Sequence, residues 1–119
     1  MANNKKDTGD FGERAAADYL AYRGYTVVTR NFRTRLGEID LIMRGEKYLL
    51  FVEVKTRRAG SMVSGEEAVG YHKQQRLRAA AEYYLAGHST ALQPRFDVIC
   101  IDLGYNGSIA DIRWIENAF

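Results

Sequence analysis

Residues 49–57, LLFVEVKTR, combine the pattern of a buried β-strand with two charged side chains near its centre. Leu49–Val52 and Val54 form the nearly continuous apolar run that is typical of a strand buried on both faces. Glu53 and Lys55 interrupt this run, although an unpaired charge in a low-dielectric interior is costly. Because successive side chains of a strand alternate between its faces, Glu53 and Lys55 point to the same side. We therefore expect a central strand that presents a carboxylate and an ammonium together.

The composition around this strand is that of a single globular domain. The chain has 119 residues, of which 46% are hydrophobic and 27% are charged, and this balance excludes disordered and fibrous classes. The single cysteine, Cys100, lies in an apolar run and is interpreted as a buried side chain in a reducing compartment. The polar opening MANNKKDTGD contains no signal peptide, and no apolar run approaches the ~20 residues of a membrane helix. We expect a cytoplasmic protein with a disordered tail at 1–7 and one domain at 8–119.

Hydrophobic periodicity predicts seven elements in the order α-β-β-β-α-β-β. The helices are expected at 8–23 and 64–86, and the second opens with a capping box of Ser64 and Glu67. The strands are expected at 25–32, 36–43, 47–56, 96–103 and 109–115. Short connections favour an antiparallel meander of the first three strands, and the long helical crossover permits a parallel pairing afterwards. The sequence therefore predicts an α/β fold with a mixed central sheet flanked by helices.

Each predicted helix has an apolar side at helical spacing. These sides are expected to face the core through Phe11, Ala15, Tyr19 and Tyr22 in the first helix, and through Val69, Leu77, Ala80 and Tyr84 in the second. In the second helix the basic residues are left to the opposite, solvated side.

The hairpin between the second and third strands brings two carboxylates together. We expect a two-residue turn at 45–46. In that register Asp40 lies opposite Phe51, and Glu38 lies opposite Glu53. Asp40 is then diagonal to Glu53 on the same face of the sheet, within reach of a shared ion.

Asp40, Glu53 and Lys55 are the residue types that phosphodiester hydrolysis requires. Two neighbouring carboxylates repel each other, and a hard divalent cation such as Mg²⁺ relieves this while keeping waters that a phosphate can displace. A lysine on the same face can help to deprotonate a water or neutralise charge on the phosphate. The alternative is a simple cross-strand ion pair on a solvated face.

Basic residues gather in three segments that contain no acid, at 21–37, 55–65 and 73–78. The net charge of +2 is too small to indicate a nucleic-acid-binding protein by itself, but this distribution suits a polyanion whose backbone must be bound. The alternative is that these are ordinary solvated faces. The candidate nucleic-acid-binding residues are Arg33, Arg35, Arg57, Arg58, Lys73 and Arg76.

Two of these motifs carry a family resemblance. GEIDLI (37–42) and FVEVKTR (51–57), with thirteen residues from Asp to Glu, resemble the PD-(D/E)XK nuclease superfamily. The whole chain is more closely similar to the uncharacterised family typified by YraN, which is related to archaeal-type Holliday-junction resolvases. The further motifs that carry this likeness are Gly12-Glu13, Asn31-Phe32-Arg33, Lys73-Gln74, Arg95-Phe96-Asp97-Val98 and Asn117-Ala118-Phe119. The resemblance implies a restriction-endonuclease-like core, so that 8–119 would be a single nuclease-like domain.

The resemblance also implies roles for individual residues. Asp40 and Glu53 look like the carboxylates of a metal site, with the carbonyl of Val54 as a third ligand. Lys55 looks like the catalytic lysine. Glu13 matches a helix-borne glutamate that serves as a further ligand in resolvase-like members.

The resulting expectation is a Mg²⁺- or Mn²⁺-dependent endonuclease that hydrolyses DNA, with branched or structured DNA favoured. Lys73 and Gln74 resemble helix residues that lie near the scissile phosphate in related nucleases. The resolvase likeness suggests a homodimer, because symmetric cutting of two strands needs two sites related by a two-fold axis. No membrane partner and no small-molecule cofactor are expected. Two alternatives stay open, a non-catalytic DNA-binding or assembly module and an RNA-processing nuclease.

Overall fold

The element order α-β-β-β-α-β-β is present in the structure, a computed structural model that describes residues 5–60 and 69–119. The helices are α1 (Lys5–Ala21) and α2 (Tyr71–Gly87). The strands are β1 (Thr26–Arg33), β2 (Glu38–Arg44), β3 (Tyr48–Arg58), β4 (Gln93–Leu103) and β5 (Ile109–Ile115). The predicted order is confirmed.

The five strands form one mixed sheet in the order β1-β2-β3-β4-β5. β3 and β4 are parallel, whereas the other neighbours are antiparallel. The crossover from β3 to β4 contains α2, as a parallel pairing requires. The α/β class and the mixed sheet are therefore confirmed, and β3 is the central strand.

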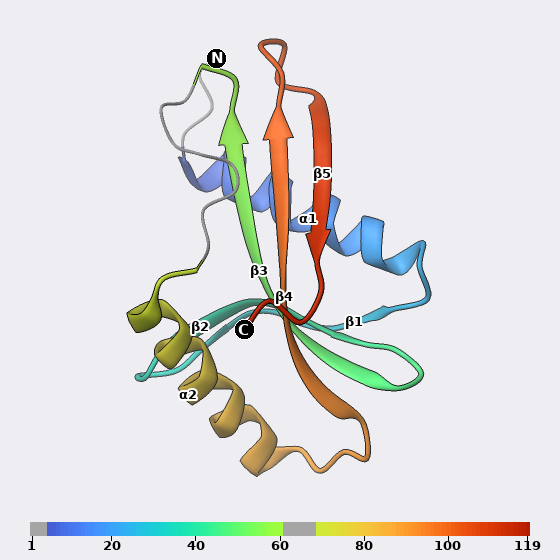
Figure 1. Ribbon diagram of the computed structural model, residues 1–119, viewed down its shortest axis with the longest axis vertical. Coiled ribbons are helices and arrows are strands. Elements are labelled where there is room, and N and C mark those ends of the chain that lie inside the picture. The colour runs from blue at the N-terminus through green and yellow to red at the C-terminus, as the bar shows by residue number, and fades with distance from the viewer. Residues whose placement is uncertain (1–4, 61–68) are drawn as a thin grey trace.

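Each face of the sheet is covered by one helix, and each face has its own core (Figure 1). On the first face, α1 packs on apolar side chains of β2, β3 and β4 that include Leu41, Leu50, Val52 and Ile99. On the second face, α2 packs on Ile42, Leu49, Phe51, Val98 and Cys100. Because β3 is covered on both faces, consecutive residues of this strand must be apolar, which explains the run at 49–52.

The first helix differs from its prediction in two respects. It begins at Lys5, so residues 5–7 are helical and do not belong to a tail. Its predicted core side is confirmed only in part, because Ala15 and Tyr19 pack partly buried against the core, whereas Phe11 and Tyr22 are exposed. The buried positions are the small or apolar Gly12, Ala16, Ala17 and Leu20. The small side chains allow a close approach, and a Cβ atom at Gly12 would overlap the side chain of Thr56 on β3.

The second helix begins later than predicted. Val69 and Gly70 are not helical, so no continuous helix runs from Ser64 to Ala86. Gly70 is the N-cap in extended conformation, without a side-chain cap. The predicted capping box, at Ser64 and Glu67, lies outside the described residues. The predicted core-facing residues Val69, Leu77, Ala80 and Tyr84 are all buried, so that prediction is confirmed.

The hairpin between β2 and β3 has a longer connection than predicted. Arg44 pairs with Leu49, and Leu41 pairs with Val52. The predicted two-residue turn is therefore wrong, and the predicted register is shifted by two residues along β3. The connection at 45–47 is closed by a hydrogen bond from the amide of Gly45 to the carbonyl of Tyr48, the first residue of β3. Since a shift of two residues keeps every side chain on its face, the alternation argument survives.

Candidate carboxylate site at the fork of β2 and β3

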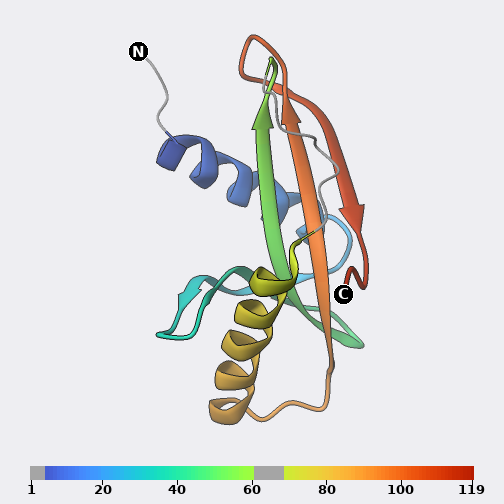
Figure 2. The ribbon, with the colours of Figure 1, turned by 60° about the vertical axis from the view of Figure 1, so that its left-hand side comes forward.

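β2 and β3 separate at Asp40. The paired part of their ladder ends at Leu41, and Ile39 packs with Ile42 in the α2-side core, which strict alternation does not allow. The amide of Val54 donates a hydrogen bond of 2.9 Å to Asp40 Oδ2. In a continuous antiparallel ladder this amide would donate to a backbone carbonyl of β2. Here the side-chain carboxylate of Asp40 accepts the hydrogen bond instead. Figure 2 shows the β1–β2 hairpin extending away from the other strands.

Continued one residue past its last pair, Leu41 with Val52, the corrected register would set Asp40 level with Glu53 rather than diagonal to it, and the two side chains are hydrogen-bonded to each other. Glu53 is only 5% exposed. The pKa of Asp40 is raised from 3.8 to about 8, first by burial and then by the charge of Glu53, while the hydrogen bond from Val54 acts in the opposite direction. The two carboxylates therefore repel each other, and the pair is stabilised by a proton or by a cation.

A cation from α2 reaches this pair. Lys73 Nζ lies 2.7 Å from Glu53 Oε2, although 56% of the lysine side chain is exposed. Burial lowers the pKa of Lys73, but the hydrogen bond and charge of Glu53 outweigh it, so the net shift of the pKa is upward. The neighbouring Gln74 does not point to the pair, because its amide donates to the carbonyl of Val69 at 2.7 Å and closes the start of α2. Both residues were predicted to bind nucleic acid, and no pattern in the sequence indicated these two contacts.

Lys55 lies two residues beyond Glu53 on β3, half-buried and paired in register with Cys100 of β4. Strand alternation places its side chain on the same face as Glu53. The structure therefore keeps the predicted Glu53 and Lys55 together on one strand, with Asp40 supplied by the neighbouring strand.

Glu13 on α1 lies near this group but makes a different contact. Its carboxylate is hydrogen-bonded to the side chain of Asn31, which has a left-handed backbone with φ of 51°. Burial is the main reason that the pKa of Glu13 is raised, and its charge also raises the pKa of Asp40. Within 5–60 and 69–119, no group of three or more His, Cys, Asp or Glu is arranged to hold a metal, so Glu13 is not grouped with Asp40 and Glu53 as a ligand.

The donor atoms at the fork are oxygens. Asp40 and Glu53 provide two carboxylates, and the carbonyl of Val54 faces the same side of β3 as its amide, which donates to Asp40. Mg²⁺ and Mn²⁺ prefer such hard oxygen ligands, and Mg²⁺ typically uses one or two carboxylates. The pKa of Asp40 stays raised, by burial and by the charge of Glu53, although Lys73 already lies beside Glu53. These residues fit a hard divalent cation.

Two of the predicted nucleic-acid-binding arginines have partners elsewhere in the fold. Arg57 Nε lies 3.3 Å from Asp102 Oδ1 on β4. Arg58 donates a hydrogen bond of 2.6 Å to the hydroxyl of Thr8 on α1. These two side chains tie β3 to its neighbours, which makes them weaker candidates for contact with a ligand.

The other predicted arginines gather around the β1–β2 hairpin and α2. Arg33 and Arg35 lie at the tip of the hairpin, and Arg76 lies on α2, and all three are exposed. Arg33 Nε is 3.2 Å from the exposed Glu38. Arg76 therefore shares α2 with Lys73, whereas Arg33 and Arg35 lie on the hairpin.

A second buried acid, Asp97 on β4, is structural. It is fully buried and accepts hydrogen bonds from Arg95 at 2.9 and 2.8 Å, from Trp114 Nε1 at 2.8 Å, and from the amide of Asn117 at 3.0 Å. These donors tie β4 to β5 and to the C-terminal segment. All carboxylate oxygens are satisfied, so this acid is not available to a ligand.

The mixed sheet between two helices, with an acidic pair where two central strands divide, defines a protein with a restriction-endonuclease-like core. The family model described as "Uncharacterised protein family UPF0102" matches residues 12–101. The chain therefore belongs to this family, which is the one typified by YraN, and the predicted resemblance is confirmed.

Individual relatives align over nearly their full length. The UPF0102 protein of Clostridium acetobutylicum is 44% identical over 120 residues, covering 100% of this chain and 98% of the relative. That of Syntrophotalea carbinolica is 42% identical over 120 residues, covering 100% and 96%. That of Caldanaerobacter subterraneus is 41% identical over 118 residues, covering 98% and 97%. Among the described residues, neither helix has the length and apolar character that crossing a membrane requires.

Proposed function

We propose that this protein is a Mg²⁺- or Mn²⁺-dependent endonuclease that hydrolyses phosphodiester bonds of branched or structured DNA. The observation that supports this most is the position of Asp40 beside Glu53 at the strand fork, with Lys55 on the same face of β3. A buried acidic pair that raises the pKa of one member to about 8 is electrostatically expensive without a cation. Strongly shifted pKa values are concentrated at functional sites, so the shift at Asp40 supports a catalytic role for this pair.

The residues of the site would have separate tasks. Asp40, Glu53 and the carbonyl of Val54 would hold the cation, which polarises the phosphate and makes an attacking water more acidic. Lys55 would neutralise the negative charge that grows on the phosphate, or in its neutral form accept a proton from the attacking water. The amide of Val54 would keep the carboxylate of Asp40 oriented.

Lys73 would respond to the cation. Its ammonium lies 2.7 Å from Glu53 Oε2, and a divalent cation would compete for the same carboxylate. Once displaced, the exposed side chain could bind a phosphate of the substrate. The start of α2 would thus contribute to substrate binding only when the site is loaded.

The test is a cleavage panel with four-way junction, flap and linear DNA, each with Mg²⁺, Mn²⁺ or EDTA. Glu53→Gln and Lys55→Met should each reduce metal-dependent cleavage by about 100-fold or more. Glu46→Gln, at an exposed acid in the turn of the same hairpin, is the matched control and should cleave normally. Cleavage that survives both site variants would overturn the assignment. Matched RNA substrates in the same panel test the RNA-processing alternative.

A non-catalytic DNA-binding or assembly module is the second candidate. The contact between Lys73 and Glu53 favours it, because an internal cation already satisfies one carboxylate. This candidate predicts salt-dependent DNA binding with no metal-dependent cleavage of any substrate. If the protein cuts branched DNA as a resolvase does, it should be a homodimer. Light scattering at assay concentrations measures this, and a monomer would contradict the resolvase-like activity.

A further inference from the structure

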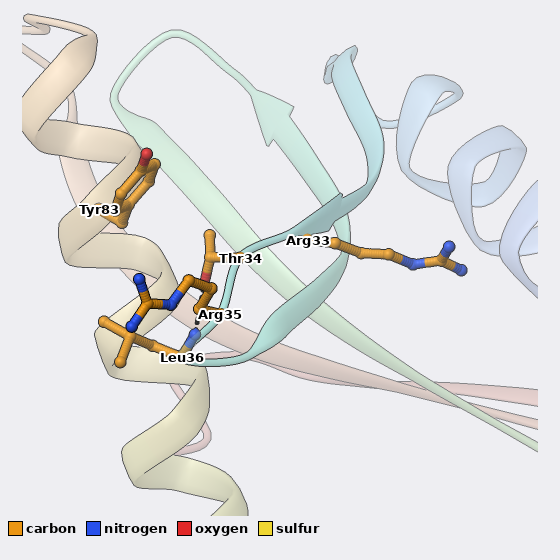
Figure 3. Close-up of a pocket in the computed structure, with 5 residues that line it drawn as sticks. All are labelled: Arg33, Thr34, Arg35, Leu36 and Tyr83. Carbon is orange, nitrogen blue, oxygen red and sulfur yellow. Dashed lines mark hydrogen bonds between the residues drawn. The ribbon is translucent and has the colours of Figure 1, made fainter.

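A pocket of about 670 Å³ lies outside the carboxylate site, between the tip of the β1–β2 hairpin and α2. It is lined by Arg33, Thr34, Arg35, Leu36 and Tyr83 (Figure 3). Figure 3 shows Arg35 and Leu36 on the side of the hairpin that faces Tyr83, whereas the side chain of Arg33 points away from it. The lining therefore combines an aromatic ring, an aliphatic side chain and a guanidinium.

The hairpin side of the pocket is held in one conformation. The hydroxyl of Thr34 accepts hydrogen bonds from the amides of Leu36 and Gly37 at 3.0 and 3.1 Å, and the amide of Thr34 donates to the carbonyl of Gly37 at 2.8 Å. Gly37 also packs directly on the backbone of Arg76, where a Cβ atom would overlap the carbonyl oxygen. The turn is thus fixed against α2, so a ligand would bind without first ordering it.

The chemistry of the pocket suits a nucleotide. Tyr83 is 63% exposed, and its ring rests against Phe32 with the centroids 6.4 Å apart, which leaves the rest of the ring open. Leu36 is 57% exposed. Arg35 makes no ion pair with any residue in the described part of the chain, so its charge is available to a phosphate. An aromatic ring beside an arginine is the arrangement on which unpaired bases stack.

The position of the pocket relates it to the carboxylate site. Tyr83 follows Lys73 by ten residues on α2, which is about 15 Å along the helix axis. That distance equals roughly four base-pair steps of 3.4 Å along the axis of a DNA duplex. Arg76 lies between them, two helical turns before Tyr83 and so on the same side of α2. A strand with its scissile phosphate at Glu53 could follow this basic side of the helix to the pocket.

We infer that this pocket binds an unpaired nucleotide of the DNA substrate, with the base on Tyr83 and Leu36 and a phosphate at Arg35. The inference rests on the proposed function, because the strand is placed by its phosphate at the carboxylate site. It narrows the substrate to DNA with a single-stranded segment about four nucleotides from the bond to be cut. A base paired within a duplex keeps its faces stacked and cannot cover Tyr83.

The test measures binding without cleavage, by fluorescence anisotropy with Ca²⁺ in place of Mg²⁺ so that a hard cation still occupies the carboxylate site, of a forked duplex and of a blunt duplex with the same paired sequence. The wild-type protein should prefer the fork. Tyr83→Ala should weaken fork binding by about 5- to 100-fold, the range expected for one base–aromatic stack, and should leave blunt-duplex binding unchanged. Tyr83→Phe keeps the ring and should bind like the wild type. Arg35→Gln should weaken fork binding and reduce its salt dependence.

Matched controls are Tyr22→Ala, at an exposed tyrosine beyond the end of α1, and Arg44→Gln, at an exposed arginine at the other end of β2. Both should bind the fork normally. Equal fork binding by Tyr83→Ala and the wild type, or an equal loss on the fork and the blunt duplex, would overturn the inference, as would a preference for forked RNA. Fork binding through Tyr83 by a protein that cleaves nothing would refute the nuclease proposal alone. Equal metal-dependent cleavage of the fork by Tyr83→Ala and the wild type would refute the role of the pocket but not the nuclease proposal.

Discussion

Lys73 Nζ on α2 lies 2.7 Å from Glu53 Oε2 on β3, so the helix supplies positive charge to a carboxylate that is only 5% exposed. The two residues are twenty positions apart, with Glu53 on β3 and Lys73 within the crossover that leads from β3 to β4. The contact neutralises one member of the acidic pair and leaves Asp40 with a raised pKa. Metal binding, stability and pH response should therefore be linked through these three side chains.

Replacing Lys73 with Met should destabilise the metal-free protein by about 1–2 kcal/mol, because Glu53 stays buried without its partner. The loss should be smaller than for a fully buried pair, since 56% of the lysine side chain is exposed. Added Mg²⁺ should stabilise Lys73→Met more than the wild type, because no internal cation competes for Glu53. Urea unfolding in EDTA and in Mg²⁺ measures both effects. Lys47→Met, at an exposed turn position, is the control, and identical metal responses in all three proteins would contradict this prediction.

The stability of the metal-free protein should fall as the pH rises toward 8. Asp40 has a pKa of about 8 in the folded state and 3.8 as the ordinary value, so the folded state holds a proton that the unfolded chain has already lost. The stabilisation is complete below pH 4 and is lost as the pH rises through 8. Asp40→Asn cannot lose this proton, so it should be the more stable protein at pH 9 by a few kcal/mol, roughly as the linkage relation gives. Parallel slopes of unfolding free energy against pH for the two proteins would refute the assigned shift.

Gly37→Ala should destabilise the protein, because a Cβ atom would overlap the carbonyl oxygen of Arg76. Backbone cannot move aside as a flexible side chain can, so the hairpin must shift from α2, at a cost of about 1–3 kcal/mol. Gly9→Ala is the control, since Gly9 lies in α1 with open space around it and the substitution should be neutral or stabilising by up to about 1 kcal/mol. Thermal unfolding of both variants decides the point. The same Gly37 variant should also lose fork preference in the binding assay, as the pocket depends on this contact.

Asp97→Asn should be among the most damaging conservative substitutions in the chain. It leaves Arg95 with the exposed Glu116, 3.1 Å away, in place of its buried carboxylate partner, so the loss should lie toward the lower end of the about 3–5 kcal/mol that breaking a buried ion pair costs. Asp111→Asn removes an exposed acid that lies 3.3 Å from Arg113, and should change stability by less than about 1 kcal/mol. Chemical denaturation provides the comparison. Similar losses from the two substitutions would show that Asp97 is not the anchor of the C-terminal segment.

The sequence by itself determined the order of the elements and, on β3, which side chains share a face. The apolar run at 49–52 identified the central strand, because only a strand covered on both sides can bury consecutive apolar residues. Alternation placed Glu53 and Lys55 together without any knowledge of a neighbour. These properties are local, so the pattern of residues is enough to predict them.

The tertiary structure decided which of these side chains meet. The connection at 45–47 sets the register of β2 on β3 and so lets Asp40 reach Glu53, and the conformation of a turn cannot be read from alternation. The crossover carries Lys73 back to Glu53, and packing on α1 and β4 occupies Arg57 and Arg58. Such contacts join residues far apart in the chain and depend on how helices dock on the sheet. The sequence therefore supplied the chemical groups of the site, and the packing of α2 and the β1–β2 hairpin decided their arrangement.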